Sequence, residues 1–240
     1  MPTCAPPRWS ARSALRTWAS GSACKPSNYQ RRRLEASYAD FLADRRHAQA
    51  VRFFIDELHG PTDLAGRETQ IAAFVPVLAR SFPPGLVDTV AALAAWHALS
   101  ESLDVGMGRH LAAGAIGPRR YATAWRASNR AAGRQRQVAL MLRIGSQIDR
   151  HVRDPLLMGT LRMMRGPAML AGLGSLHRFL ESGFDAFASM RGAGRLLAAM
   201  EQRETALCAA LCDDDRQALA DWLPTSRRPF AAKSRSKASP

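Results

Sequence analysis

The fold is decided by residues 51–63, which read VRFFIDELHGPTD. Four apolar residues in this stretch recur three or four positions apart and therefore share one face of a helix: Val51, Phe54, Ile55 and Leu58. Such a face must be buried against another element. Gly60 and Pro61 then end the helix, because glycine adopts the left-handed conformation at low cost and proline cannot continue the helical hydrogen bonds.

Two carboxylates, Asp56 and Glu57, lie in the last turn of this helix. The carboxyl end of a helix already carries partial negative charge and free carbonyl groups, so both side chains are mildly destabilising there. Solvent or a salt bridge to one of the many arginines would compensate, and we favour this explanation. The alternative is that a broken local rule marks a functional site. Asp56 and Glu57 are therefore candidate binding residues.

Residues 53–57, Phe-Phe-Ile-Asp-Glu, resemble the Phe-Phe-Leu-Glu-Glu (FFLEE) signature of a family of uncharacterised helical proteins from bacteria. The similarity continues through residues 97–104 and 179–184 and covers most of residues 34–210. The two departures from the signature are conservative, since they keep an apolar side chain and a carboxylate. The resemblance implies a mostly helical domain, and it implies no activity, substrate or cofactor.

The spacing of apolar residues predicts helices along the rest of the chain. In chain order they span residues 32–59, 63–82, 86–113, 118–152, 156–180 and 194–211, with a short last turn reaching Trp222. We expect a bend at residues 44–46, an interruption at residues 166–167, and a close approach of another helix at the glycines of residues 172–174. No stretch alternates with period two for long enough to be a strand. The prediction is an all-α protein, a single bundle of about seven antiparallel helices with Trp96 and Trp125 buried.

Charge is concentrated at the two ends of the chain. The 34 Lys and Arg outnumber the 20 Asp and Glu and give a formal net charge of +14. Seven positive charges precede the first acidic residue, Glu35, and five follow the last, Asp221, so the segment between them is close to neutral. We predict disordered basic tails at residues 1–30 and 224–240 around a helical domain at residues 31–223. The near-neutral body argues against a fold built for nucleic acid.

The sequence also indicates the cellular compartment of the protein. No apolar run reaches the roughly 18 to 20 residues that a membrane span needs, and residues 1–30 lack the continuous apolar stretch of a secretory signal. We therefore predict a cytoplasmic protein with no membrane partner. Cys208 and Cys212 lie one helical turn apart, and we expect both to face a core in a reducing compartment rather than to form a disulfide framework.

Two pairs of histidine and glutamate could carry chemistry. His97 and Glu101 are four residues apart, with Asp104 three further on, and His177 and Glu181 repeat the same spacing. Residues four apart share a helix face, and histidine with carboxylate suits zinc, manganese or iron. The four would form a metal site if their helices were antiparallel neighbours. The spacing is not the Glu-x-x-His of carboxylate-bridged bundles, so we predict no cofactor and favour surface pairs worth about half a kcal/mol or less.

A row of arginines gives a second hypothesis. Arg126, Arg130 and Arg134 follow at four-residue steps, with Arg119 and Arg136 nearby. Such a row could track phosphates of a nucleic acid. A solvated helix face explains it equally well, and we favour that explanation because a charge row alone is weak support for a nucleic-acid partner.

The sequence does not decide whether the protein is an interaction module or an enzyme. There is no phosphate loop, dinucleotide fingerprint, nucleophile elbow or His-Glu-x-x-His motif. We favour a protein-interaction or structural module, whose partner is another protein or a second copy. The alternative is a helical enzyme that binds a metal or small ligand in a pocket between the third and fifth predicted helices, with Asp56, Glu57, His97, Glu101 and Asp104 in it. An exposed apolar patch would favour the first, and a concave pocket the second.

Overall fold

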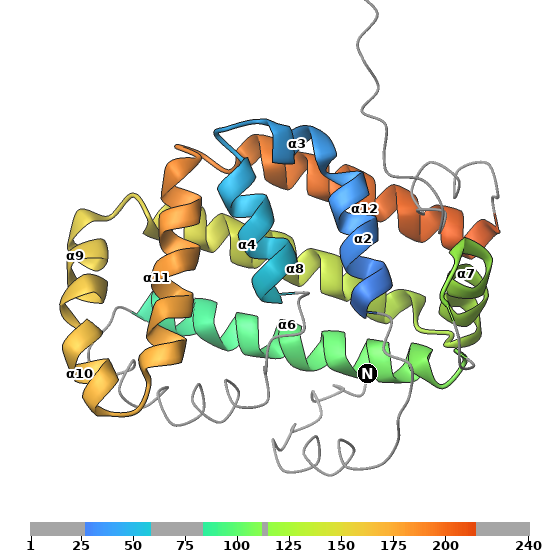
Figure 1. The fold of residues 1–240 in the computed structure, drawn as a ribbon, viewed down its shortest axis with the longest axis horizontal. Helices are drawn as coiled ribbons and strands as arrows, with labels where there is room; N and C mark the ends of the chain where they lie inside the picture. The colour runs from blue at the N-terminus through green and yellow to red at the C-terminus, as the bar shows by residue number, and fades with distance from the viewer. Residues whose placement is uncertain (1–26, 59–83, 112–114, 215–240) are drawn as a thin grey trace, which may run out of the picture.

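The computed structural model describes residues 27–58, 84–111 and 115–214. All regular structure in these ranges is α-helix, as the apolar spacing predicts, and no strand occurs among the described residues (Figure 1). The predicted helix at residues 63–82 and the turn reaching Trp222 lie outside the described ranges. Within these ranges no helix combines the length and the hydrophobicity that a membrane crossing requires.

The first predicted helix, at residues 32–59, is divided into three helices in the structure. They are α2 (Ser27–Ser37), α3 (Ala39–Ala43) and α4 (Ala48–Leu58). The predicted bend at residues 44–46 is confirmed as a full break, where the Asp44 carboxylate accepts a hydrogen bond from the Arg46 amide at 3.0 Å and contacts the His47 ring at 2.8 Å. Because α2 begins at Ser27, four residues assigned to the leading tail are helical, and Tyr29 among them is buried.

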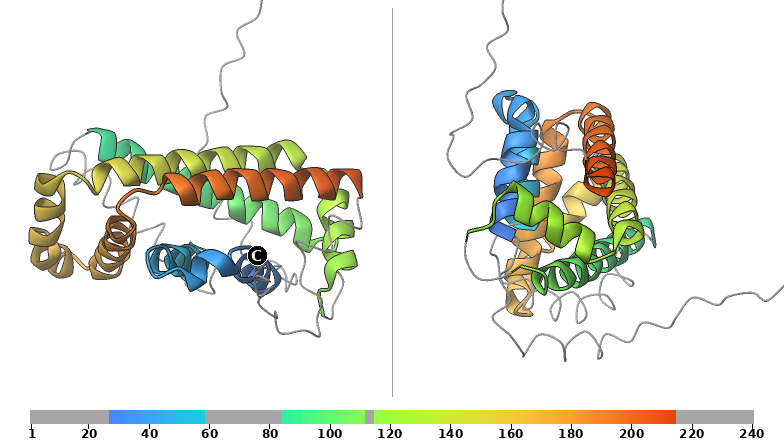
Figure 2. Two further views of the ribbon diagram at one scale, coloured as in Figure 1. Left: turned by 90° about the horizontal axis from the view of Figure 1, so that it is seen from above. Right: turned by 90° about the vertical axis from the view of Figure 1, so that its right-hand side faces the viewer.

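Three long helices form one layer of the molecule. They are α6 (Pro84–Gly108), α8 (Ala131–His151) and α12 (Gly194–Asp213), and α8 lies between the other two in an antiparallel arrangement (Figure 1). A second layer crosses them and contains α2, α4 and α11 (Gly174–Ser189) (Figure 2). The bundle is confirmed, with the difference that its second layer runs across the first. Trp96 of the long layer and Trp125 are buried, as predicted.

Short helices close the two ends. One end holds α7 (Pro118–Ala127), and the other holds an arm made of α9 (Pro155–Met163) and α10 (Arg165–Leu170) (Figure 1). The predicted single helix at residues 118–152 is wrong, because Asn129 adopts a positive φ of 47° and separates α7 from α8. Asparagine is one of the few side chains that tolerates this conformation.

Glycines at residues 172–174 make a turn instead of a close helix contact. Gly172 has a φ of 73°, and a Cβ built there would meet nothing within 4 Å, so the predicted close approach is wrong at this position. The predicted interruption falls just before Gly166 and Pro167, at Met164 between α9 and α10, and the turn adds a second break after Leu170. Close packing occurs at Gly183, where a Cβ would lie 2.8 Å from the Phe53 ring.

Two glycine substitutions that should change the free energy of unfolding in opposite directions test whether residues 172–174 form a turn. Gly172→Ala places a side chain in the left-handed region and lowers the free energy of unfolding by about 1 kcal/mol. Gly159→Ala, in open space inside α9, raises it by about 0.5–1 kcal/mol because alanine favours the helix. Urea denaturation of both variants measures the two changes, and equal signs would contradict the turn.

Candidate functional site

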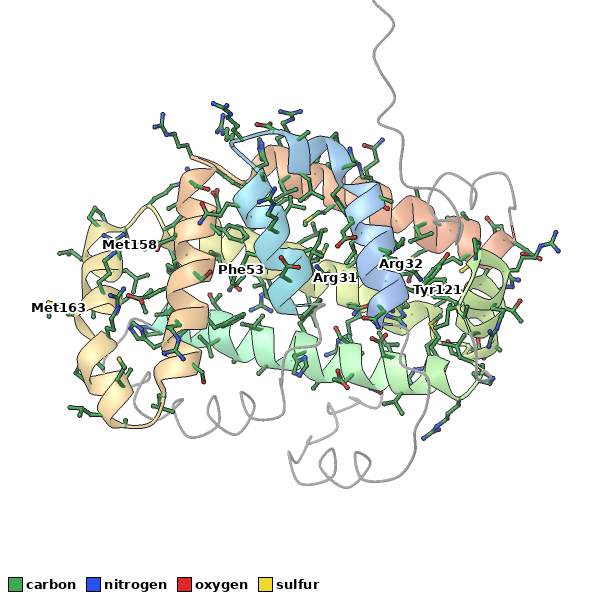
Figure 3. The ribbon with its side chains drawn as sticks, in the orientation of Figure 1. Arg31, Arg32, Phe53, Tyr121, Met158 and Met163 are labelled. Atoms are coloured by element: carbon green, nitrogen blue, oxygen red, sulfur yellow. The ribbon has the colours of Figure 1, made fainter. Side chains whose placement is uncertain are left out.

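The stretch that begins with Phe53 lies in the middle of the molecule. Figure 3 shows Phe53 on α4. Its ring packs on Phe179 of α11 with centroids 5.3 Å apart, and Ile55 is buried. Asp56 is exposed and accepts a hydrogen bond from Arg31 Nη2 at 2.9 Å. The salt bridge to an arginine, the favoured explanation for Asp56, is therefore present. The Glu57 side chain lies outside the described part of the structure.

Behind Phe53 lies a cavity of about 70 Å³, which we call the apolar chamber. Five helices line it: α4, α6, α8, α11 and α12. Every lining residue within the described ranges is apolar, including Phe54, Trp96, Met141, Ile148 and Phe184. The chamber thus lies between the third and fifth predicted helices, beside the end of the first. Of the polar candidates whose side chains the structure describes, Asp56, His97, Glu101 and Asp104, none is among its lining residues.

A second cavity of about 60 Å³ adjoins it, which we call the polar chamber. The two share three lining residues, Phe54, Trp96 and Met141, and so meet at one wall. The polar chamber is also lined by charged, amide and thiol side chains: Gln30, Arg33, Arg134, Gln137, Glu204 and Cys208. These come from α2, α8 and α12.

The first charge pair of this chamber joins α2 to α12. Arg33 Nη1 lies 2.7 Å from Glu204 Oε1, with the side chains 8% and 13% exposed. Tyr38 donates its hydroxyl to the same oxygen at 2.9 Å. Burial disfavours the charged guanidinium, but the charge and the hydrogen bond of Glu204 outweigh burial and raise the pKa of Arg33. Burial and then the Glu204 charge raise the pKa of Tyr38, so its hydroxyl stays protonated and donates.

A second charge pair joins α6 to α8. Arg134 Nη2 lies 3.2 Å from Asp104 Oδ1, and its other terminal nitrogen donates to Gln137 at 3.2 Å. Gln30 of α2 donates to the same Asp104 oxygen at 3.0 Å. Among the predicted binding residues whose side chains are described, Asp104 alone is therefore joined to the polar chamber.

The other predicted site residues lie apart from this chamber. His97 and Glu101 are half-buried on α6 and line neither cavity. His177 is buried on α11, with Nε2 2.8 Å from the Leu161 carbonyl and Nδ1 3.4 Å from Glu181. Glu181 in turn accepts two hydrogen bonds of 3.0 Å from Arg165. The second pair therefore fastens the arm to α11.

The predicted metal set His97, Glu101, His177 and Glu181 is not assembled. Among the described residues, no three His, Cys, Asp or Glu side chains are grouped as a metal ion would require. The prediction needed α6 and α11 to be antiparallel neighbours, whereas α11 lies in the layer that crosses α6 (Figure 1). The side chains of α11 that were to bind metal face the arm instead.

The arginine row is likewise divided. Arg126 belongs to α7 and lies 2.7 Å from Asp214, while Arg130 and Arg134 lie beyond the break at Asn129. Arg134 is buried in the polar chamber. The three therefore do not form a continuous exposed strip that could follow a phosphate backbone.

Arg33 and Glu204 were missed by the sequence analysis, although Glu204 left a signal. It lies four residues after Met200 and three before Leu207, both of which are buried, so it occupies the apolar face of its helix. A charged residue at a core position is rare unless it is paired. That position in the apolar spacing could have marked Glu204 as part of a buried network.

These features define the protein as an all-helical bundle with two adjoining cavities. A family model described as a domain of unknown function (DUF8198) matches residues 17–218. The chain belongs to this family. Comparisons with curated proteins and with solved structures find no match.

Cys208 provides a chemical probe of the polar chamber. Burial, with a contribution from Glu204, raises the pKa of its thiol to about 11, whereas Cys212 is exposed, contrary to the prediction that both face a core. At pH 8 the reactive thiolate of Cys208 is roughly 100-fold less populated than that of an ordinary thiol. We expect a chain with Cys4→Ser and Cys24→Ser to be alkylated first at Cys212, with the Cys208 rate rising up to about pH 11. Mass spectrometry of timed samples measures both rates, and equal rates would contradict the burial of Cys208.

Proposed function

We propose that this protein is a binding module that holds a small, largely apolar molecule in the apolar chamber. The observation that carries the proposal is the lining, since five helices contribute only apolar residues to a cavity of about 70 Å³. Protein interiors are normally packed as densely as organic crystals. A cavity in a core costs roughly 24 cal/mol per Å³, so an empty chamber is destabilising and a bound apolar molecule would offset that cost.

The lining also supports binding in preference to acid–base catalysis. The alternative hypothesis placed histidine and carboxylate side chains in a pocket here, and the chamber is lined instead by residues such as Phe54, Leu93 and Phe184. Such walls recognise shape and apolar area, and they supply no proton donor or acceptor. We therefore infer a carrier, sensor or structural role for the bound molecule rather than its chemical conversion.

The stretch at residues 53–57 gives this proposal a link to the family. We infer that it is the family's FFLEE-type signature and that the family is bacterial. Phe53 and Phe54 both line the apolar chamber, so the signature would mark a chamber wall. The domain limits at residues 31–223 and the cytoplasmic location remain predictions, and a nucleic-acid partner remains the alternative that we do not favour.

A second candidate function, self-association, is supported by the arm. Four large apolar side chains of α9 and α10 are exposed: Leu156, Met163, Met169 and Leu170. Leu170 is 92% exposed, and Met163 lies at the outer edge of the molecule (Figure 3). Single exposed apolar residues are ordinary, but a group on one short arm is typical of an interaction surface.

The occupant we propose for the arm is a second copy of this chain. Charges of both signs border the apolar residues, since Arg162 and Asp185 are exposed and lie 3.4 Å apart. In a twofold dimer the same patch meets itself, so each Arg162 can face the partner subunit's carboxylate. A patch bordered by one sign of charge would instead repel its copy.

The chamber proposal predicts that small apolar molecules, xenon and benzene, stabilise the protein. At one hundred times its Kd a ligand adds about 2.7 kcal/mol to the free energy of unfolding, which thermal denaturation detects as a higher Tm. Ile148→Phe fills the chamber and should abolish this rise, whereas Leu156→Phe adds the same ring on the surface and should leave it unchanged. No rise in the original protein, or an equal rise in both variants, would contradict the proposal.

The arm proposal predicts a dimer that analytical ultracentrifugation detects as a concentration-dependent mass. Met163→Gln combined with Leu170→Gln should weaken it at least about tenfold, because each buried Leu or Met side chain contributes about 1.5–3 kcal/mol. Val105→Gln changes an exposed apolar residue on α6 and is the matched control. A monomer at every concentration rules out the second copy as the occupant of the arm.

A further inference from the structure

We propose that the polar chamber holds the head of the same ligand, and that this head is an uncharged carbonyl group of a ketone, amide or ester. This inference rests on the proposed binding of an apolar body in the apolar chamber. The two chambers share Phe54, Trp96 and Met141 as walls and are therefore neighbours, and we infer that a rotation of these side chains lets one elongated molecule occupy both. An apolar pocket that ends in a few polar groups is the usual form of a site for an amphipathic ligand.

Charge balance excludes an ionised head. Arg33 is paired with Glu204 and Arg134 with Asp104, so the two cations at the chamber are matched by two anions. Both arginines are buried. A carboxylate entering this place would add an uncompensated negative charge, and an ammonium group an uncompensated positive one, in surroundings that solvate charge poorly.

The chamber has a surplus of hydrogen-bond donors. Each guanidinium carries five N–H groups and no acceptor. The Nε of Arg33 is buried and has no hydrogen-bond partner within the described ranges. Arg33 is also more than nine-tenths buried and lines the chamber, so this donor is shielded from solvent at the chamber wall. A buried donor without a partner is costly, and a ligand that brings an acceptor oxygen removes that cost.

A carbonyl group satisfies both constraints. Its oxygen has two acceptor lone pairs and no donor, and it carries no net charge. A hydroxyl head would also accept, but it would bring another donor into a place that already has too many. The polar chamber therefore favours carbonyl over hydroxyl, carboxylate and amine heads, whereas the apolar chamber sets the size of the attached body.

A matched series of probes tests whether the polar chamber prefers a carbonyl head to an apolar or an ionised one. The four probes are 4-phenylbutan-2-one, butylbenzene, 3-phenylpropanoate and 3-phenylpropylamine, which share an apolar body and differ in the head. Titration calorimetry on the full chain should give the ketone an affinity about tenfold higher than butylbenzene, as expected for one added hydrogen bond from a charged donor. The two ionised probes should bind at least about tenfold more weakly than the ketone.

Cys208 locates the head within the protein. Its thiol lines the polar chamber and not the apolar one. Saturating ketone should slow the alkylation of Cys208 several-fold and leave Cys212 unchanged, whereas butylbenzene should protect neither cysteine. Protection of Cys208 by both probes would show that the head is not recognised there.

The variant Glu204→Gln tests the charge argument directly. It keeps the shape of the side chain and leaves Arg33 without its matching anion, so the affinity for 3-phenylpropanoate should rise about tenfold while that for butylbenzene stays the same. Glu201 is exposed on the same helix, so Glu201→Gln makes the same chemical change at the surface and serves as the control. A folded Glu204→Gln protein with an unchanged preference overturns the charge argument.

The outcomes separate this inference from the proposed function. If none of the four probes binds, the chamber proposal and this inference both fail. If butylbenzene binds as tightly as the ketone, the apolar chamber is a site and the carbonyl head is excluded. If 3-phenylpropanoate is the tightest probe for the unaltered protein, the head is an anion and the balance of the two ion pairs does not govern recognition.

Discussion

The structure depends on the pairing of two buried arginines. Arg33 with Glu204 joins α2 to α12, and Arg134 with Asp104 joins α6 to α8. A buried charge without a partner is strongly destabilising, with removal of one partner costing roughly 3–5 kcal/mol. Apolar side chains can slide along one another at little cost, whereas an arginine must meet its carboxylate within hydrogen-bonding distance. The pairs therefore fix how far each helix is shifted along its neighbour.

That constraint explains why the core is divided. With the register of α2, α6, α8 and α12 set by polar contacts, the crossing helices α4 and α11 must fit the remaining space with aromatic side chains. Phe53 reaches Gly183, where only the absence of a Cβ leaves room for its ring. Rigid rings fill such space less completely than flexible chains, and the apolar chamber is what remains between them.

The sequence predicted the parts of this fold that local spacing determines. The helices at α6 and α12 agree with their apolar periods, and the break near Asp44 agrees with the charges that interrupt the first stripe. Asn129 was missed because nothing in its neighbourhood demands a left-handed residue. Asp104 was named as a binding residue for its spacing to His97, but its actual partners, Gln30 and Arg134, come from other helices. The apolar period could mark Glu204 as a buried position, but it cannot name the partner of Glu204, because Arg33 lies 171 residues away.

The position of the histidine–glutamate pair on α11 explains why the side of this helix toward the chamber is apolar. His177 and Glu181 are four residues apart and share one face, which is turned to the Leu161 carbonyl of α9 and to Arg165 of α10. Phe179 lies between them in sequence, and a step of two residues rotates a side chain to nearly the opposite face of a helix. That face meets Phe53 of α4. The arm binds the polar side chains His177 and Glu181 of α11, so the opposite side of this helix, toward the apolar chamber, carries aromatic rings. The helical turn that was predicted to supply metal ligands therefore provides an apolar wall.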